Sequence, residues 1–457
     1  MIVRSSRKWR YIAAAVCCVL VVLAAAAWHI ISLLRAEPTI KIDYLAEYNR
    51  VTKPADYDPD KDAAVHYQKL FSQFVPVPDI VKNKDDVWPA ELSPAEFETL
   101  KEWASLNEPA LEALHRAAQC PYWWVEARSR DGLLRAIELQ NSDEQRECPW
   151  VIVLLARYKA SQGNIDGALQ HLADLHMMGV HRGSGDTSLL QQLSGVGTCE
   201  ISYRAVLTIL NRCNVEAGAL NRLRTVFVSR LAQIEMPRFT QSALLVELDA
   251  IQKVFTDDGR QDGRLIPREL CRIRKEFVPY SKPLPYSRAL WICLTHPTRK
   301  DTVDLCKDFW EAANKLTGTP PWQLRARSTT YEDELVPRLA GNFFLKDGSD
   351  VLARFIEFGW RRKAYHEAVV TILAIQAFEA EKGRLPNSLA ELEAESFPSV
   401  PIDPYSGKPL VYKVAGDDFI LYSVGQDFAD SGGLRSYWGR DGGDQVFWPV
   451  ENSADGL

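Results

Sequence analysis

No catalytic or metal-binding motif is complete in this sequence. None of its nine cysteines forms a C-x-x-C pair, which leaves a zinc ribbon or a thioredoxin-type redox site unsupported. The zincin pattern H-E-x-x-H begins at His366 and Glu367, but Val370 stands where the second histidine must lie one helical turn later. The glycine-rich stretch 181–188 lacks the Lys-Ser/Thr pair of a phosphate loop, and no G-x-S-x-G nucleophile elbow occurs. A catalytic centre is therefore not visible in the sequence.

Three histidines that are close in sequence also fail to form a metal site. His171, His176 and His181 follow one another in steps of five residues. Each such step turns about 140° around an α-helix, so the three side chains cannot share one helical face. We therefore expect them to lie in separate surroundings.

The charge balance lacks the basic excess of a general nucleic-acid binder. The 457 residues carry a formal net charge of −6, which argues against nucleic acid as a partner. The length is sufficient for two or three domains with cores of their own.

Only one apolar run is long enough to cross a membrane. Residues 11–34 read YIAAAVCCVLVVLAAAAWHIISLL, and about 20 apolar residues span a bilayer as a helix. Four basic residues and no acid occupy the first ten positions, so the positive-inside rule places residues 1–10 in the cytoplasm. We predict a single-pass signal anchor over 11–35, with everything from 36 onward extracytoplasmic. The alternative is a cleaved signal peptide ending near the alanines at 24–27, for which the apolar run is too long.

Helical spacing dominates the next part of the chain. Residues 36–92 form a proline-rich lead-in with one short helix around 61–74, and residues 93–358 form a helical domain in which strand signals are scarce. A helix begins at Ser93, which has the spacing of a capping box with Glu96. The seven cysteines outside the apolar run are expected to be buried single thiols of this helical core.

The character of the sequence changes after residue 358. Residues 359–450 are predicted to form a separate α+β unit, followed by a tail at 451–457. A helix ends near residue 383, and two strand-like runs at 410–414 and 419–424 are joined by a hairpin signal. Residues 445–448 supply a third strand. The predicted fold class is therefore mainly α, an extracytoplasmic helical array with one transmembrane helix and a small C-terminal α+β domain.

The order of short motifs in this last unit resembles that of a known domain. The motifs are EKGRLP (381–386), SLAEL (388–392), DPYSGKPLVY (403–412) and FILYSVGQD (419–427). Together, over residues 361–448, they resemble the periplasmic domain of the type II secretion major pseudopilins of the G type. The resemblance covers about a fifth of the chain.

The resemblance implies a calcium site in the loop after the second strand. By position, the ligands are the carbonyl of Val424 and the carboxylates of Asp427, Asp441 and Asp444. Calcium prefers several hard oxygen ligands of these two kinds. The alternative is that the aspartates and glycines of this loop only make turns, with Asp430 an example of turn chemistry.

Two departures from the pseudopilin pattern limit what is carried over. The segment LRSYWGR (434–440) lengthens the loop, which affects the later two ligands. The apolar helix lies some 325 residues upstream of the domain rather than continuous with its helix, and no Gly-Phe processing site precedes it. The chain is therefore not expected to be a subunit polymerised in a pseudopilus.

These features together predict a non-catalytic protein of the bacterial inner membrane. The whole chain is similar to membrane-anchored envelope proteins of bacteria such as planctomycetes, with the bulk in the periplasm. The expected role is a scaffold or protein-interaction module, with the membrane and an unknown protein as partners and no small-molecule substrate identified. A component associated with a type II secretion or pilus-like system is one alternative, and an envelope hydrolase is the other.

The scaffold hypothesis and the hydrolase hypothesis predict different structural features. A hydrolase requires a deep pocket with a perturbed histidine or carboxylate, whereas a scaffold presents an exposed apolar or aromatic patch. The segments that could supply such a patch are 120–124, 149–150 and 320–322.

Overall fold

Helices make up most of the part of the chain that the structure describes. The structure is a computed structural model, and its described part is 65% helical with one small three-stranded sheet. The described residues are 3–80, 82, 88–129, 132–137, 142–229, 236, 238–257, 259, 262–277, 283–346, 349–393, 400–438 and 442–450.

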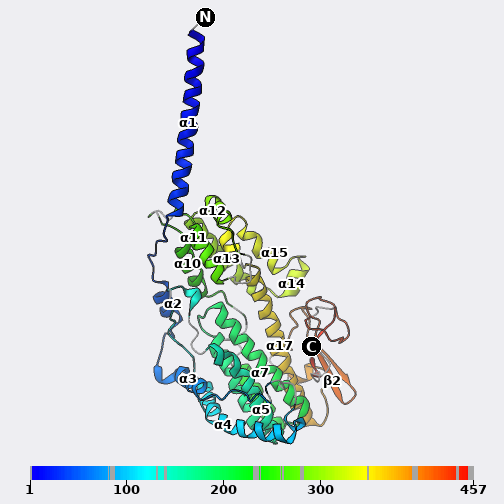
Figure 1. The fold of residues 1–457 in the computed structure, drawn as a ribbon. Coiled ribbons are helices and arrows are strands. Elements are labelled where there is room, and N and C mark those ends of the chain that lie inside the picture. The colour runs from blue at the N-terminus through cyan, green and yellow to red at the C-terminus, as the bar shows by residue number, and fades with distance from the viewer. Residues whose placement is uncertain are drawn as a thin grey trace.

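Figure 1 shows the α-helices in their order along the chain. They are α1 (Val3–Leu34), α2 (Tyr44–Thr52), α3 (Ala64–Gln73), α4 (Pro94–Ala118), α5 (Ser142–Ser161), α6 (Ile165–Gly183), α7 (Leu189–Arg212), α8 (Ala217–Ser229), α10 (Gln241–Val254), α11 (Pro267–Phe277), α12 (Tyr286–Thr295), α13 (Arg299–Thr317), α14 (Pro321–Ala326), α15 (Tyr331–Leu335), α16 (Phe343–Lys346), α17 (Ser349–Lys382) and α18 (Ala390–Glu393). Short 3₁₀ helices lie at Pro59–Lys61, Pro89–Glu91, Leu134–Ala136 and Val336–Leu339, and the strands are β1 (Val411–Ala415), β2 (Asp418–Ser423) and β3 (Gln445–Trp448).

Local sequence signals explain where several helices begin. Ser93 and Glu96 form the predicted capping box at the start of α4, with Pro94 in the first turn. Between α5 and α6 the chain turns at Gly163, whose φ is +81°, and the Asn164 side chain accepts a hydrogen bond from the Gly167 backbone. The start of α4 agrees with the sequence prediction.

Helix α1 stands apart from the rest of the molecule (Figure 1). Its segment Trp9–Leu34 has a mean hydropathy of 2.5, and none of its apolar window is buried within the protein. Only its last turn packs on the body, where Leu33 joins the core formed by α10–α16. One helix in the described chain is thus long and apolar enough to cross a membrane, as the sequence predicts.

Two hydrophobic cores lie along the body, and α17 belongs to both. One core joins α3–α8 with the C-terminal sheet, and the other joins α10–α16. Residues 353–360 of α17 lie in the second core, and residues 364–378 lie in the first. The domain boundary predicted between 358 and 359 falls inside this helix, at a buried Gly359 that the helix simply runs through.

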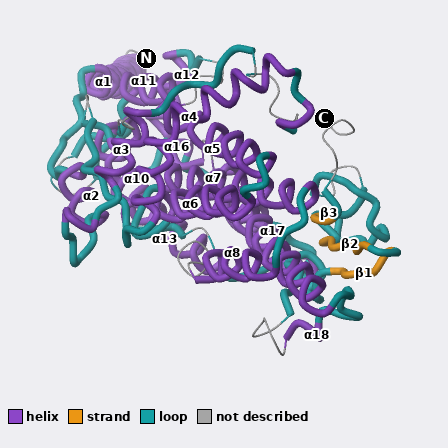
Figure 2. The backbone as a smooth tube through the Cα atoms, turned by 90° about the horizontal axis from the view of Figure 1, so that it is seen from below, coloured by secondary structure: helices purple, strands orange, loops and turns teal. Residues whose placement is uncertain are grey.

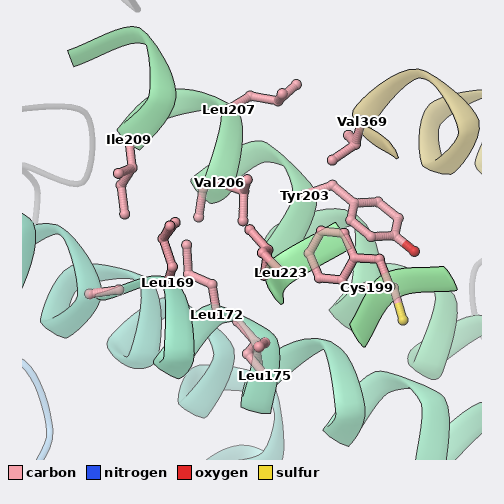
Figure 3. Close-up of a cluster of buried hydrophobic side chains, with 14 of the residues drawn as sticks. Leu169, Leu172, Leu175, Cys199, Tyr203, Val206, Leu207, Ile209, Leu223 and Val369 are labelled. Atoms are coloured by element: carbon pink, nitrogen blue, oxygen red, sulfur yellow. The ribbon is translucent and has the colours of Figure 1, made fainter. Parts of the chain in front are cut away.

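The contact between α6 and α7 is close because glycines replace side chains there. A Cβ on Gly195 would lie 2.6 Å from the Gly179 carbonyl oxygen, so any side chain would push the helices apart. Cys199 packs at this contact, where a Cβ on Gly179 would lie 2.6 Å from its Sγ, and the core continues along both helices through the side chains drawn in Figure 3. All nine cysteines are free thiols. Of the seven outside the apolar run, four are buried as expected, whereas Cys120, Cys213 and Cys271 are partly exposed.

The C-terminal unit is an antiparallel sheet packed against α17. Its strand order is β1-β2-β3, and all three strands lie within one residue of their predicted positions. Figure 2 shows the sheet beside the C-terminal half of α17. The rings of Tyr365 on α17 and Phe447 on β3 meet edge to face, with centroids 5.3 Å apart. The sheet therefore shares the core of the α3–α8 helices.

A tight turn joins this unit to α14 as well. The backbone N–H of Trp322 donates to the carbonyl of Pro404 at 3.1 Å. A Cβ on Gly407 would lie 2.9–3.1 Å from the Trp322 indole ring. Because Gly407 also has φ +69°, both its backbone conformation and the contact with the indole require glycine.

Gly407→Ala tests this contact, and Gly416→Ala is its matched control. Gly416 also has a positive φ, +67°, but no atom lies within 4 Å of a Cβ placed there. We expect Gly416→Ala to lower the free energy of unfolding by about 1–2 kcal/mol, the cost of a left-handed alanine. Gly407→Ala is expected to lower it by about 1–3 kcal/mol more, because the methyl group meets the indole. Urea titration of the full-length protein in detergent measures both, and equal losses would contradict the contact.

Candidate functional site

Three of the four predicted calcium ligands lie in the described part of the loop between β2 and β3. They are Val424, Asp427 and Asp444. Val424 is buried, and its backbone N–H donates to the Asp403 carboxylate at 3.2 Å. Asp427 accepts a hydrogen bond from the Ala429 backbone at 3.1 Å, the geometry of an Asx turn. The fourth predicted ligand, Asp441, lies outside the described residues.

Asp444 is buried and orders the loop from the inside. Its two carboxylate oxygens accept the backbone N–H groups of Ser431 at 3.2 Å and Gly433 at 2.7 Å. Burial raises the pKa of the Asp444 carboxyl, while these two hydrogen bonds lower it. Asp430 makes a similar turn, in which one oxygen accepts from the Gly432 backbone and from the Tyr422 hydroxyl.

The described part of this loop does not present a ready-made calcium site. Among the described residues, no three or more His, Cys, Asp or Glu side chains gather where they could hold a metal. The carboxylates of Asp427 and Asp444 are engaged with backbone N–H groups of the loop itself. Calcium binding therefore stays a prediction from the resemblance.

Asp403 holds the loop to the rest of the unit, and the sequence prediction missed it. Its carboxylate is fully buried and accepts hydrogen bonds from the Ser423 hydroxyl at 2.7 Å and the Tyr405 backbone at 3.0 Å, besides that from Val424. It lies in the DPYSGKPL segment, which was singled out for its order along the chain rather than for chemistry. An aspartate directly before proline in a turn is the available signal, but it does not identify a partner 20 residues away.

Asp444→Asn is expected to destabilise the loop, whereas Asp427→Asn is its mild control. The asparagine at 444 would turn an amide donor toward one of the two backbone donors, which leaves a partly buried N–H without an acceptor. We expect a loss of about 1–3 kcal/mol in the free energy of unfolding. Asparagine at 427 keeps an acceptor oxygen and costs little.

The loss in the free energy of unfolding is measured for both variants, once with excess EDTA and once with excess calcium. If Asp444 acts through its hydrogen bonds to the loop, Asp444→Asn loses the same amount under both conditions. A loss that appears only with calcium would instead show that the carboxylate holds the ion.

A pocket of about 420 Å³ lies next to this loop, between the loop and helices α14, α15 and α17. Gln426 and Phe428 form its wall on the side of the loop, and Tyr405 lies beside them. The remaining lining residues are Pro321, Leu324, Arg325, Ser328, Thr329, Thr330, Tyr331, Glu332, Ala353, Arg354 and Glu357. The pocket thus combines an apolar floor with two arginines and two glutamates.

Charged and aromatic side chains meet in the lining of this pocket. The Arg325 guanidinium lies over the Phe428 ring, 5.5 Å from its centroid, so the cation is partly engaged with the aromatic face. The lining contains hydroxyl groups but no histidine or cysteine. A nucleophile with an adjacent imidazole base is therefore absent from the lining.

A second unusual group of residues is buried between α6, α7, α8 and α17. His176 and His366 face one another with ring centroids 6.4 Å apart, and Phe227 packs 4.6 Å from the His176 ring. The Tyr203 hydroxyl is 2.7 Å from Nδ1 of His366. Neither ring nitrogen of His176 has a hydrogen-bond partner among the described residues. Residues 190 positions apart thus meet in one core.

Burial keeps these two histidines neutral. It lowers the pKa of His176 to about 3, with the nearby Arg362 charge acting in the same direction. The pKa of His366 is also lowered, first by burial and then by His176 and Arg362. None of the pocket's lining residues belongs to this group, so the perturbed histidines and the pocket do not form one site.

The other two histidines of α6 lie in separate surroundings, as expected from their spacing. His171 lies 3.1 Å from the Lys159 ammonium, and burial with that charge lowers its pKa to about 4. His181 lies between the Tyr67 hydroxyl and the Cys120 carbonyl, each at 2.9 Å.

The buried histidine pair predicts a loss of stability in acid. In the unfolded chain a histidine takes up a proton below about pH 6.5, but His176 resists protonation in the folded protein until about pH 3. The free energy of unfolding therefore falls as pH drops from 6.5 toward 3, by about 2 kcal/mol between pH 7 and pH 5 for each such histidine.

His176→Phe should remove its share of this pH dependence, because phenylalanine does not titrate. Phe227→Leu is the matched control, since it disturbs the same packing without changing a titratable group. Urea titrations at pH 7 and pH 5 give the comparison. An unchanged difference between the two pH values in His176→Phe would contradict the assignment.

The three segments proposed as aromatic patches differ in exposure. Trp150 on α5 is 55% exposed and Trp322 on α14 is 37% exposed, whereas Trp123 packs against the core. The most exposed tryptophan outside α1 is one that the sequence prediction did not name, Trp291 on α12, at 67%. The described surface thus carries separate exposed aromatic residues on different helices.

Comparison with known proteins adds no relative. No protein-family model, no curated protein and no solved structure matches the chain. The resemblance of the C-terminal unit to pseudopilins therefore stays a prediction.

Proposed function

We propose that the protein is a single-pass, membrane-anchored protein-interaction module of the bacterial cell envelope. In this proposal residues 1–10 lie in the cytoplasm, α1 crosses the inner membrane, and the helical body and C-terminal unit lie in the periplasm. The observation that carries the proposal is α1 itself, an apolar helix that the body leaves uncovered.

Because the body leaves α1 uncovered, this helix is better explained as a membrane anchor than as a helix of the protein core. A helix of such hydropathy exposed to water along its whole length would be strongly unfavourable, at about 25 cal/mol per Å² of apolar surface. Among the described residues, the body buries α1 at Leu33 in its last turn, so a bilayer is the environment that suits the remaining apolar surface of the helix.

A binding role rather than a catalytic one is supported by the separation of the pocket and the histidines. A hydrolase needs a perturbed acid or base within reach of its substrate. Here the two facing histidines are buried in a core, and the pocket is lined by residues suited to hold a group rather than to activate it. The exposed Trp150 and Trp322 are candidate contacts for a protein partner.

The three-stranded sheet on the end of a long helix supports the pseudopilin-like assignment at the level of topology only. The continuous α17, the hairpin of β1 and β2, and the later strand β3 follow the order that the resemblance implies. An association with a secretion or pilus-like system is a further proposal, for which co-purification of pseudopilins is the test.

The anchor is tested with alkaline phosphatase fused to the C-terminus of the full-length protein in a bacterial host. We expect an active fusion, because the enzyme folds only outside the cytoplasm, and retention of the full-length product in the membrane after alkaline carbonate washing. Leu20→Asp combined with Leu23→Asp should abolish retention, since each charge costs about 2.5–3.5 kcal/mol at the centre of a bilayer.

Leu106→Asp combined with Val228→Asp is the matched control, because both residues are exposed on the body. A shorter, carbonate-soluble product would show a cleaved signal peptide, and an inactive fusion would contradict the orientation.

A further inference from the structure

Helix α12 lies at the end of the body from which α1 projects. Figures 1 and 2 both show α11 and α12 beside the base of α1. Helix α1 contacts α11, and α11 packs against α12. Leu33 is buried in the core to which Ala289 and Cys293 of α12 also belong. The last turn of α1 and the buried face of α12 therefore belong to one hydrophobic core.

The opposite face of α12 is exposed and has the composition of a membrane interface. Trp291 is 67% exposed, and Arg288 and Thr295 are exposed on the same side of the helix. Tyr286, at the first position of the helix, is 46% exposed. Tryptophan and tyrosine are enriched at the level of lipid headgroups, where an amphipathic ring meets both water and hydrocarbon.

Basic side chains are exposed on the elements around this face. Arg35, which directly follows α1, is exposed, as are Lys275 on α11 and Arg288 on α12, and the exposed Glu37 follows Arg35 by two residues. The acidic side chain of α11 that the structure describes, Glu269, is nearly buried and is already paired with Arg268 and Arg272. Basic side chains near a membrane surface are attracted to lipid phosphates.

We propose that the exposed face of α12, with Trp291 at its centre, rests on the phospholipid headgroups of the membrane that α1 crosses. The inference rests on the proposed function, because it needs α1 in a bilayer. It adds a second contact, which fixes the body against the membrane surface instead of letting it swing on the chain after α1. A membrane is favoured over a protein as the occupant because α1 brings this face to the lipid surface.

The test uses tryptophan fluorescence of the full-length protein in nanodiscs. One set of nanodiscs contains a phospholipid with a nitroxide on its headgroup, which quenches only tryptophans close to the headgroups, and the other set lacks it. The quenched amplitude is the difference in emission between the two sets. Trp291→Phe is compared with Trp150→Phe, which removes another exposed tryptophan from a helix far from α1 along the body (Figure 1).

We expect Trp291→Phe to lower the quenched amplitude by about the contribution of one tryptophan. Trp150→Phe is expected to leave the quenched amplitude unchanged. Phenylalanine keeps the bulk of each site, and near-ultraviolet circular dichroism confirms that both variants fold. An unchanged amplitude in Trp291→Phe would overturn the proposal, including the case in which a second copy or a protein partner covers α12.

The anchor and the α12 contact fail in distinguishable ways. Trp9 and Trp28 of α1 supply quenching that remains in both variants if α1 spans the bilayer. Full-length protein that does not incorporate into nanodiscs would refute the anchor and the contact together. Incorporation with residual α1 quenching but no Trp291 contribution would refute the contact alone.

Discussion

The packing of α17 is the constraint on which the rest of the body depends. This helix of 34 residues lies in both hydrophobic cores, with Phe355 and Ile356 in one and Ile372 and Ile375 in the other. It also carries the C-terminal sheet, through contacts such as Tyr365 with Phe447. A helix shared by two cores couples them, because neither can separate without exposing apolar side chains of the same element. The C-terminal unit is thus fastened to the helical body along one continuous support.

Buried polar groups then fix the details of that arrangement. Asp403 and Asp444 hold the loops of the C-terminal unit by accepting backbone N–H groups, which removes the penalty of burying those donors. In the helical core, His176 and His366 are tolerated because they remain neutral. The first arrangement gives the loops a defined shape, while the second makes the body sensitive to acid. The pocket beside the loop is lined by neither histidine.

The elements that local pattern determines were predictable from the sequence. The capping box at Ser93 and the three short strands follow from side-chain chemistry within a few residues, and the structure confirms each one. Helix α2 was missed because its start depends on one capping aspartate, Asp43, in a stretch otherwise rich in proline. The boundary placed after residue 358 was guided by Gly359, but packing on both sides of a helix outweighs the roughly 1 kcal/mol that glycine costs there.

The features that depend on distant residues were not predictable in the same way. Asp403 acts on Ser423 and Val424, and His176 meets His366, only after the helices and the sheet have packed. The predicted calcium site stays a prediction, because Asp441 lies outside the described residues. The spacing of the predicted ligands is compatible with an ion, yet Asp427 and Asp444 point to backbone donors of their own loop. Trp291 was passed over because a single tryptophan in an apolar helix is more often core than surface.

The central claim is that α1 crosses a bilayer and that the body rests on its surface at α12. Electron cryomicroscopy of the full-length protein in nanodiscs tests this most directly. The account predicts density for α1 through the disc, with α12 in contact with the headgroup layer and α17 directed away from it. A body separated from the headgroups by a clear gap, or an α1 lying outside the disc, would contradict it.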